Sequence, residues 1–154
     1  MNQNAKAFEI KQLAKSDLSS FESLINLFNV VFEEEEPAIG SKVNLEKLLG
    51  NSGFIALAAI SKNEIVGGLT AYVLPLYYSE QSEIFLYDLA VKPEFQRMGI
   101  GKGLIQHLKL HCVMNGIKEF FVMAHEEDES ANDFYHSTGG KSERVVNFVY
   151  EAFE

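Results

Sequence analysis

The sequence has few of the features that mark exported, membrane-bound or disulfide-stabilised proteins. It contains one cysteine, Cys112, which excludes an internal disulfide and fits a reducing compartment. No apolar run approaches the ~20 residues that span a bilayer. The polar start, Met1–Asn4, lacks the apolar segment of a signal peptide. We therefore expect a cytoplasmic protein that has no membrane association.

Basic residues are also scarce. The chain has 13 Lys and Arg residues against 22 Asp and Glu residues, which gives a formal net charge of −9. Nucleic acid is not expected as a partner, because binding it normally requires a basic surface. An acidic protein favours cationic small molecules or basic proteins as partners, but charge of this size also serves solubility alone.

Hydrophobic residues, in contrast, are plentiful. They make up 47% of the 154 residues, which is ample for one core, so we expect a single domain over residues 1–154. The hydrophobic periodicity predicts these elements. Strands are expected at 7–13, 54–60, 65–74, 82–91, 118–124 and 145–150, and helices at 19–32, 43–49, 99–115 and 130–138.

The connections between these elements indicate the fold class. Tight turns join the early strands, so those strands should be antiparallel, whereas 82–91, 99–115 and 118–124 form one crossover that should be parallel. The expected fold class is α/β (α+β), a mixed and mostly antiparallel central sheet with helices on both faces. The nearly all-apolar strand 54–60 should be buried inside that sheet.

Several short motifs predict local geometry. Ser19–Glu22 has the spacing of a capping box and should begin the first helix. Gly50 and Gly116 should end helices, Gly50 in the left-handed conformation. Ser61–Glu64 reads as a hairpin turn, and Gly67–Gly68 suggests a bulge inside a strand.

A glycine-rich turn, Gln96–Gly103, lies between the strand 82–91 and the helix 99–115. The first turn of a helix presents unpaired N–H groups and the positive end of its dipole, and glycines let a ligand approach the backbone closely. The turn therefore predicts a phosphate-bearing ligand. It matches neither a Walker A loop nor a dinucleotide fingerprint, because Gly103 follows Lys102 and Leu104 occupies the third glycine position.

The pattern Gln96-x-x-Gly99-x-Gly101 resembles the acetyl-coenzyme A loop of the GCN5-related N-acetyltransferase (GNAT) superfamily. The strand end Leu89–Pro93 and the helix Ala131–Gly139, with Phe134-Tyr135 inside it, are similar to that superfamily as well. The resemblance implies a GNAT fold with acetyl-CoA as cofactor, and fourth and fifth strands that splay apart to admit it. The sequence departs from the family at Asp128, where many members have Asn, and at Gly139–Gly140, where many have Gly-Phe.

A narrower resemblance concerns three strand segments. Phe54–Ala59, Ala71–Pro75 and Ser82–Val91 look like the type I aminoglycoside 3-N-acetyltransferases. This resemblance implies direct acetyl transfer, in a ternary complex, to an amine of a polycationic aminoglycoside, and hence antibiotic resistance. A polyamine or protein N-terminal acetyltransferase, or a non-catalytic acetyl-CoA-binding module, remains the alternative.

The resemblance also implies a cofactor site. The pyrophosphate should rest on backbone N–H groups from Arg97 to Lys102, and the strand residues before the turn should offer backbone groups to the pantetheine arm. The alternative is a tight strand-to-helix turn with no ligand. The expected cofactor-binding residues are Leu89, Ala90, Val91, Gln96, Arg97, Met98, Gly99, Ile100, Gly101, Lys102 and Asn132.

An amine attacks a thioester only when it is neutral, so a base must remove its proton. Asp88 stands inside an apolar strand, where a carboxylate is costly unless it is paired or functional, and we predict that it is this base. Glu83 is a second candidate, which strict alternation places on the other face of the strand unless a bulge intervenes. Tyr87 should contact the acceptor or simply pack.

Tyr135 occupies the position of the superfamily's usual general acid, which gives a proton to the leaving thiolate. Its alternative role is packing on the sheet. The acidic residues Glu33–Glu36 and Glu126, Glu127 and Asp128 are candidates to bind a polycation, although acids at these places are commonly solvated or stabilise a helix start.

No metal site is expected. His107 and His111 are four residues apart, but Leu108 replaces the glutamate of the zincin motif and a third ligand is not evident. Cys112 falls on the apolar side of its helix and should be a buried thiol. A homodimer through the exposed parts of the last strand remains open.

Overall fold

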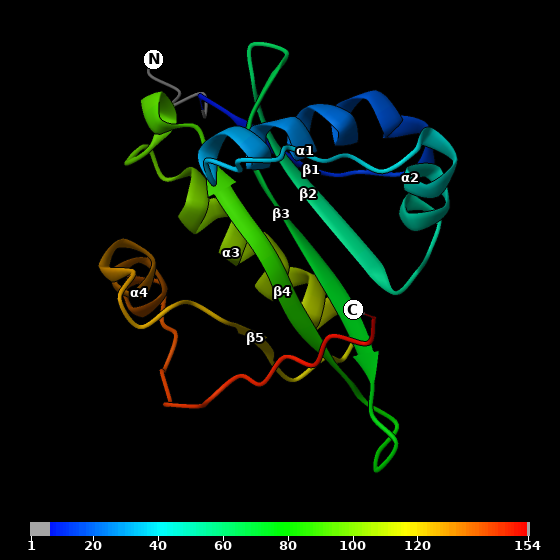
Figure 1. Ribbon diagram of the computed structural model, residues 1–154, viewed down its shortest axis with the longest axis vertical. Helices are drawn as coiled ribbons and strands as arrows, with labels where there is room; N and C mark the ends of the chain where they lie inside the picture. Colours follow the sequence, from blue (N-terminus) through cyan, green and yellow to red (C-terminus); the bar gives the residue numbers. More distant parts are fainter. Residues whose placement is uncertain (1–6, 154) are drawn as a thin grey trace. The chain divides into compact units, whose positions relative to one another are not determined.

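The computed structural model describes residues 7–153 (Figure 1). They fall into two compact units, divided between Met123 and Ala124, which are described separately below. The strands are β1 (Glu9–Gln12), β2 (Phe54–Ser61), β3 (Glu64–Pro75), β4 (Ser82–Val91) and β5 (Phe120–Val122). The helices are α1 (Leu18–Val31), α2 (Lys42–Leu49), α3 (Ile100–Met114) and α4 (Glu129–Ser137). None of these helices is long and apolar enough to cross a membrane.

The sheet in the first unit has the strand order β1-β2-β3-β4-β5. Its first three pairings are antiparallel and the β4–β5 pairing is parallel, because only that pair is joined through a helical crossover. The predicted mixed and mostly antiparallel sheet is therefore confirmed. β2 lies inside the sheet and its residues 54–59 are buried, as its continuous apolar sequence indicated.

Two adjacent glycines in β3 show that helices cover both faces of this sheet. A Cβ atom added to Gly68 would lie 2.5 Å from Leu24 Cδ1 of α1, whereas one added to Gly67 would lie 3.3 Å from Ile100 Cγ2 of α3. Successive residues of a strand point to opposite faces, so α1 and α3 pack on opposite sides. Figure 1 shows α1 in front of the strands and α3 behind them.

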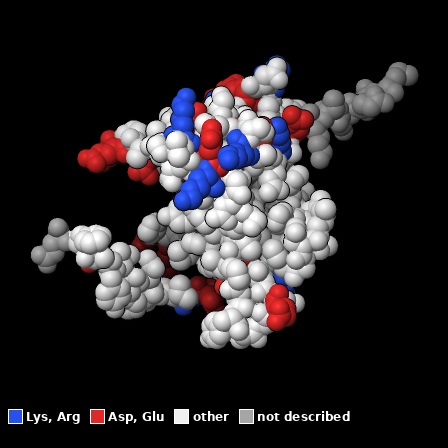
Figure 2. All heavy atoms as spheres, turned by 90° about the vertical axis from the view of Figure 1, so that its right-hand side faces the viewer, with Lys and Arg blue, Asp and Glu red and all other residues white. Residues whose placement is uncertain are grey.

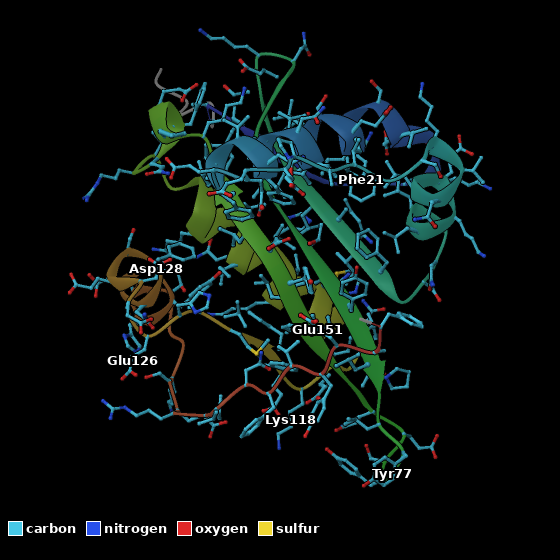
Figure 3. The ribbon with its side chains drawn as sticks, viewed as in Figure 1. Phe21, Tyr77, Lys118, Glu126, Asp128 and Glu151 are labelled. Atoms are coloured by element: carbon cyan, nitrogen blue, oxygen red, sulfur yellow. The ribbon has the colours of Figure 1, made fainter. Side chains whose placement is uncertain are left out.

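The core on the α1 face is built from the apolar stripe of α1 and the inward side chains of β2. Phe21 of α1 is 2% exposed, and its ring centroid lies 5.7 Å from that of Phe54. Figure 3 shows Phe21 between α1 and the strands. The stripe works because residues three and four apart share one helix face. The other buried members include Leu24, Leu27, Phe28, Leu45, Ala56, Ala58 and Ala90.

Two of the predicted turns are confirmed. Lys62 and Asn63 have φ values of 49° and 64° between the paired residues Ser61 and Glu64, which is the two-residue hairpin that suits twisted strands. Gly116 has φ 66° and follows α3. The next residue closes that helix end, because the Ile117 N–H donates to the Cys112 carbonyl at 2.9 Å.

Two helix-end predictions are wrong. The first helix begins at Leu18 and not at Ser19, because a 3-10 turn at Lys15–Asp17 runs directly into it. Asp17 stabilises that turn by accepting the Ala14 N–H and the Lys11 ammonium, each at 2.8 Å. Gly50 does not adopt the left-handed conformation, since its φ is −79° and its N–H still donates to the Glu46 carbonyl.

The bulge predicted at Gly67–Gly68 lies one residue earlier. The pairing with β2 shifts between Ala59 and Ile60, which leaves Val66 as the additional residue, while both glycines keep their cross-strand partners. The glycines serve close packing instead, because side chains there would meet Leu24 and Ile100. Composition alone does not distinguish these two reasons for a glycine in a strand.

The predicted strand 145–150 is wrong. The structure shows no strand in residues 138–153, and Val145, Phe148 and Tyr150 are 69%, 76% and 91% exposed. A strand needs a partner, because β propensity measures the fit of a side chain to a pleated, half-buried surface. The fifth strand is also shorter than the predicted 118–124, since it pairs with β4 only at residues 120–122.

Figure 2 shows charged side chains on the side of the molecule that lies at the right of Figure 1. Blue Lys and Arg atoms alternate with red Asp and Glu atoms over the upper part, at the height of α1 and α2. The acidic excess therefore does not gather into one patch on that part of the surface.

Candidate functional site

The loop between β4 and α3 has an unusual backbone. It begins with a 3-10 turn at Pro93–Phe95, and the following residues include two in the left-handed region, Arg97 with φ 61° and Gly99 with φ 86°. Gly99 is the N-cap of α3 and has no side-chain capping hydrogen bond. Alternating left- and right-handed residues turn successive N–H groups toward one point, which makes a concavity suited to an anion.

The N–H groups of this loop are available to a ligand. Within residues 7–153, the backbone N–H groups from Arg97 to Lys102 donate to no acceptor, whereas the next N–H, of Gly103, donates to the Gly99 carbonyl at 2.9 Å. The residues from Gln96 to Gly99 are exposed. The predicted phosphate site thus has free donors at the positive end of the helix dipole.

The side chain of Gln96 has a structural contact. Its Nε2 atom donates to the Val91 carbonyl at 3.1 Å, so it ties the loop to the end of β4. Lys92 is also engaged, since its ammonium forms an ion pair with Glu64. The side chains of Arg97, Met98 and Lys102 extend from exposed positions of the loop and of the first turn of α3.

β4 and β5 pair over only a short length. β5 contacts β4 only at Ile84, Phe85 and Leu86, so the second edge of β4 is unpaired in the described sheet from Tyr87 onward. The Lys92 N–H donates to the Val66 carbonyl of β3. By alternation, the backbone groups of Leu89 and Val91 point away from β3, toward this open edge. An amide-bearing chain is therefore able to pair there as an additional strand would.

A β-bulge changes which side chains of β4 share a face of the sheet. Thr70 pairs with Asp88 but Ala71 pairs with Leu86, so Tyr87 is the additional residue. Its ring contacts Phe85 on one side, and Ala90 belongs to the core on the α1 face. Tyr87 and Asp88 consequently share the α1 face although they are neighbours in sequence.

The Asp88 carboxyl group lies in a half-buried place. Burial raises the pKa of Asp88 above its ordinary value, and the negative charge of Glu34 raises it further. Glu34 comes from the segment after α1, which was predicted from sequence as one of two acidic candidates. A carboxylate held at a raised pKa is a stronger base than a solvated one, which suits removal of a proton from an ammonium group.

The second candidate base, Glu83, lies elsewhere. The bulge brings it to the same face as Asp88, contrary to strict alternation. Their cross-strand partners on β3, Leu74 and Thr70, are four residues apart, which is about 13 Å at ~3.3 Å per residue. Glu83 lines a cavity of about 180 Å³ at the foot of the β3–β4 hairpin, together with Tyr78 and Lys118. The two carboxylates are therefore too far apart to act on one amine.

The remaining predicted residues lie in the second unit, on or before α4. Asp128 is the N-cap and accepts the Ala131 N–H at 2.9 Å. The Asn132 amide donates to the carbonyls of His125 and Asp128 at 2.9 Å and 2.7 Å, so it holds the preceding loop. Glu126 forms an exposed ion pair with Arg144 at 3.3 Å. Figure 3 shows Glu126 and Asp128 near the start of α4.

Tyr135 is half-buried on α4, and its ring centroid lies 5.1 Å from that of Phe134. Its carbonyl accepts the Gly140 N–H at 2.8 Å, in the same kind of closed helix end that follows α3. Glu127, the last of the acidic candidates, is exposed.

Two polar residues near Asp88 were not among the sequence candidates. Thr70 is its cross-strand partner and is 8% exposed, and Tyr72 lies two residues farther along β3 on the same face. The pKa of Tyr72 is raised by burial and by the nearby Tyr87 and Asp88. Both residues follow from the pairing register of β3 with β4, but that register includes the bulge at Tyr87, which the sequence does not reveal.

Within residues 7–153, no three His, Cys, Asp or Glu side chains converge to hold a metal ion. Burial and the neighbouring His107 lower the pKa of His111. Cys112 is 5% exposed, as predicted, and burial raises the pKa of its thiol, which disfavours the reactive thiolate.

Comparison with known proteins places this geometry among acyl-group transferases. The sequence model of the acetyltransferase (GNAT) family matches residues 21–139. No curated protein sequence matches the chain.

Solved structures are similar over nearly the whole chain. An aminoglycoside acetyltransferase, meta-AAC0020, from an uncultured soil metagenomic sample and in complex with sisomicin, is 41% identical, with a TM-score of 0.94 over 98% of this chain and 100% of that chain. A second soil metagenomic aminoglycoside acetyltransferase, HMB0005, is 34% identical, with a TM-score of 0.88 over 94% and 99%. The aminoglycoside N-acetyltransferase AAC(6')-Iy in complex with CoA is 17% identical, with a TM-score of 0.80 over 99% and 100%, and shares the fold.

Proposed function

Since the chain belongs to the acetyltransferase (GNAT) family, we propose that it uses acetyl-CoA to acetylate an amine of an aminoglycoside. The observation that carries this proposal is a continuous set of free backbone groups. It runs from the open edge of β4, at the backbone groups of Leu89 and the N–H of Val91, to the unpaired N–H groups of Arg97 to Lys102. The Val91 carbonyl is occupied by Gln96. The first part suits the amide-bearing pantetheine arm and the second suits the pyrophosphate.

Acetyl-CoA supplies the acetyl group as a thioester. The chain's own part is to fix this donor against β4 and to bring a neutral amine to it. Gly99 has φ 86°, which glycine adopts without strain, and it adds no side chain to the loop. Gln96 keeps the loop attached to the end of β4.

Asp88 is the proposed base. It stands one residue before Leu89 on the bulged part of β4, and its raised pKa favours proton transfer from an ammonium group. The nitrogen lone pair that this transfer frees forms the new bond to the acetyl carbon, and the bond from that carbon to sulfur breaks. The nitrogen releases its second proton as the amide forms, which balances the proton given to the sulfur. We propose Tyr135 as the group that gives a proton to the sulfur, on the resemblance of the α4 motif.

The acceptor class rests on similarity and charge. The relative meta-AAC0020, which matches 98% of this chain, was solved in complex with sisomicin. The net charge of −9 favours a polycationic acceptor. We propose acetylation of the 3-amino group, which is the regiochemistry that the resemblance of β2, β3 and β4 to the type I enzymes implies.

Thiol release during incubation with acetyl-CoA tests this proposal. The acceptors are sisomicin, spermidine and a peptide with a free N-terminus, each at the same concentration. We expect release with sisomicin, and NMR of the product to place the acetyl group on the 3-amino nitrogen. Release with spermidine or the peptide alone would point to a polyamine or protein acetyltransferase. Tight CoA binding without release from any amine would indicate a non-catalytic module.

The variants Asp88→Asn and Glu83→Gln provide a matched pair for the base. Both remove one charge from the same face of β4, but only Asp88 adjoins the free strand edge. We expect Asp88→Asn to lower kcat by about 10²–10⁴-fold and Glu83→Gln to leave most of it. The reverse order would assign the base to Glu83.

A further inference from the structure

A line of five aromatic rings crosses the α1 face of the sheet beside Asp88. Ring centroids lie 5.3 Å apart for Phe54 and Tyr72, 5.7 Å for Tyr72 and Tyr87, 5.5 Å for Tyr87 and Phe85, and 4.9 Å for Phe85 and Phe121. Phe54 is 6% exposed and belongs to the core, whereas Tyr87 is 57% exposed. The line therefore leads from the protein interior to an open surface.

The two tyrosines in the middle of this line stand in an edge-to-face arrangement, with an angle of 78° between the rings. The face of one ring is thus turned toward the edge of the other, and an aromatic face carries partial negative charge. The bulge brings Asp88 to the same face, opposite Thr70 and near Tyr72. An aromatic face and a carboxylate are groups that bind an alkylammonium ion in proteins.

A purely structural role explains this arrangement less well. Core aromatics are normally packed among aliphatic side chains, yet Tyr87 is more than half exposed and a half-buried carboxylate adjoins the pair. Burying a carboxylate without a paired cation is costly. In the residues that the structure describes, no Lys or Arg forms an ion pair with Asp88. A cationic ligand would therefore supply the positive charge that pairs with the Asp88 carboxylate.

We propose that Tyr72 and Tyr87 form the aromatic wall of an ammonium-binding subsite with Asp88 at its base, and that Tyr72 sets the affinity for the cationic acceptor. This inference rests on the proposed function, because it assigns the amine of the acceptor to this place. It adds Tyr72, and it defines the ligand class as alkylammonium groups, including quaternary ones. Neutral sugars of similar shape should bind much more weakly.

Three tyrosine variants test the role of the wall in turnover. Tyr72→Leu removes the aromatic face and should raise KM for sisomicin about 3- to 30-fold, with a smaller change in kcat. Tyr72→Phe keeps the face and should restore most of the affinity. Tyr77→Leu is the control, because Tyr77 is 99% exposed and lies at the tip of the β3–β4 hairpin in Figure 3. An equal KM for Tyr72→Leu and Tyr77→Leu would overturn the inference, as would an equal loss in Tyr72→Phe and Tyr72→Leu.

A binding assay separates this inference from the proposed function. Choline carries a quaternary ammonium group, and 3,3-dimethylbutanol has the same shape without the charge. In NMR titrations of the wild-type protein, choline should shift the Tyr72 and Tyr87 ring signals and dimethylbutanol should not. Equal shifts with both compounds, or none with choline, would refute the ammonium subsite even where acetyl transfer is observed. Absent transfer with intact choline binding would refute the proposed function alone.

Because Tyr72 contacts the core residue Phe54, its leucine variant could lose stability. Tyr87→Leu provides a second test at a position that is 57% exposed. It should raise KM for sisomicin in the same direction and abolish the choline-dependent shift of the Tyr72 ring. An unchanged KM and an unchanged choline response in a folded Tyr87→Leu protein would overturn the proposal.

Discussion

Replacing Gly99 by alanine isolates the contribution of the β4–α3 loop to cofactor binding, because the chain contains a matched control. Gly99 has φ 86° and Gly116 has φ 66°, and an added Cβ meets no protein atom within 4 Å at either position. The two glycines flank the same helix, one before it and one after it. Gly99 lies in the proposed phosphate site and Gly116 lies at the opposite end of α3.

Both alanine variants should lose similar stability. An L-residue in the left-handed region costs about 1–2 kcal/mol. Alanine also lowers the conformational entropy of the unfolded chain, which stabilises the folded state by roughly 0.4–1 kcal/mol and offsets part of this loss. The net loss of about 1 kcal/mol corresponds to a fall in Tm of roughly 2–4 °C in a chain of this size. Because no packing contact changes, the two Tm values should agree closely.

Cofactor affinity should separate the two variants. In Gly99→Ala the new methyl group stands in open space on the loop whose N–H groups from Arg97 to Lys102 are free. We expect the Kd for CoA, measured by calorimetry, to rise at least tenfold, which is about 1.4 kcal/mol. Gly116→Ala should bind CoA as the wild-type protein does. Equal CoA affinity in the two variants would refute the assignment of the pyrophosphate to this loop.

Three further substitutions have expected outcomes. Asp88→Asn should raise the free energy of unfolding at neutral pH. The pKa of Asp88 is higher in the folded state than in the unfolded state, so the stability of the wild-type protein falls as pH rises between these two values, and at pH 3 the two proteins should be equally stable. The wild-type kcat/KM should also rise with pH through a pKa above that of ordinary Asp. Gly68→Ala should destabilise by about 1–3 kcal/mol in urea unfolding, since its Cβ would lie 2.5 Å from Leu24 Cδ1 and from the Leu57 carbonyl; an unchanged midpoint would contradict the close α1 packing. Tyr135→Phe should lower kcat with little change in CoA affinity, and unchanged turnover would remove Tyr135 from the mechanism.

Local sequence signals predicted the elements that carry the cofactor site. The fourth strand was expected at 82–91 and β4 occupies Ser82–Val91, because a long β-forming run there ends at a proline and a glycine turn. The turn at Lys62 and Asn63 was also predicted, since the residues of a two-residue hairpin decide its conformation locally. These features depend on neighbours in sequence.

Features that depend on long-range pairing were not predictable in the same way. The bulge at Tyr87 arises from the register of β4 against β3, and it reverses which residues share a face with Asp88. Glu83 and Asp88 consequently lie on one face, where strict alternation separated them. Tyr72 became a candidate only when that register was known. The apolar run 145–150 shows the converse, because strong β propensity without a pairing strand gives no strand.

The most direct test of the proposed function is the mass of sisomicin after incubation with the protein and acetyl-CoA. We predict that sisomicin gains the mass of one acetyl group, and that Asp88→Asn greatly slows this gain while binding CoA as before. Unmodified sisomicin in the presence of a folded, CoA-binding protein would contradict the proposal.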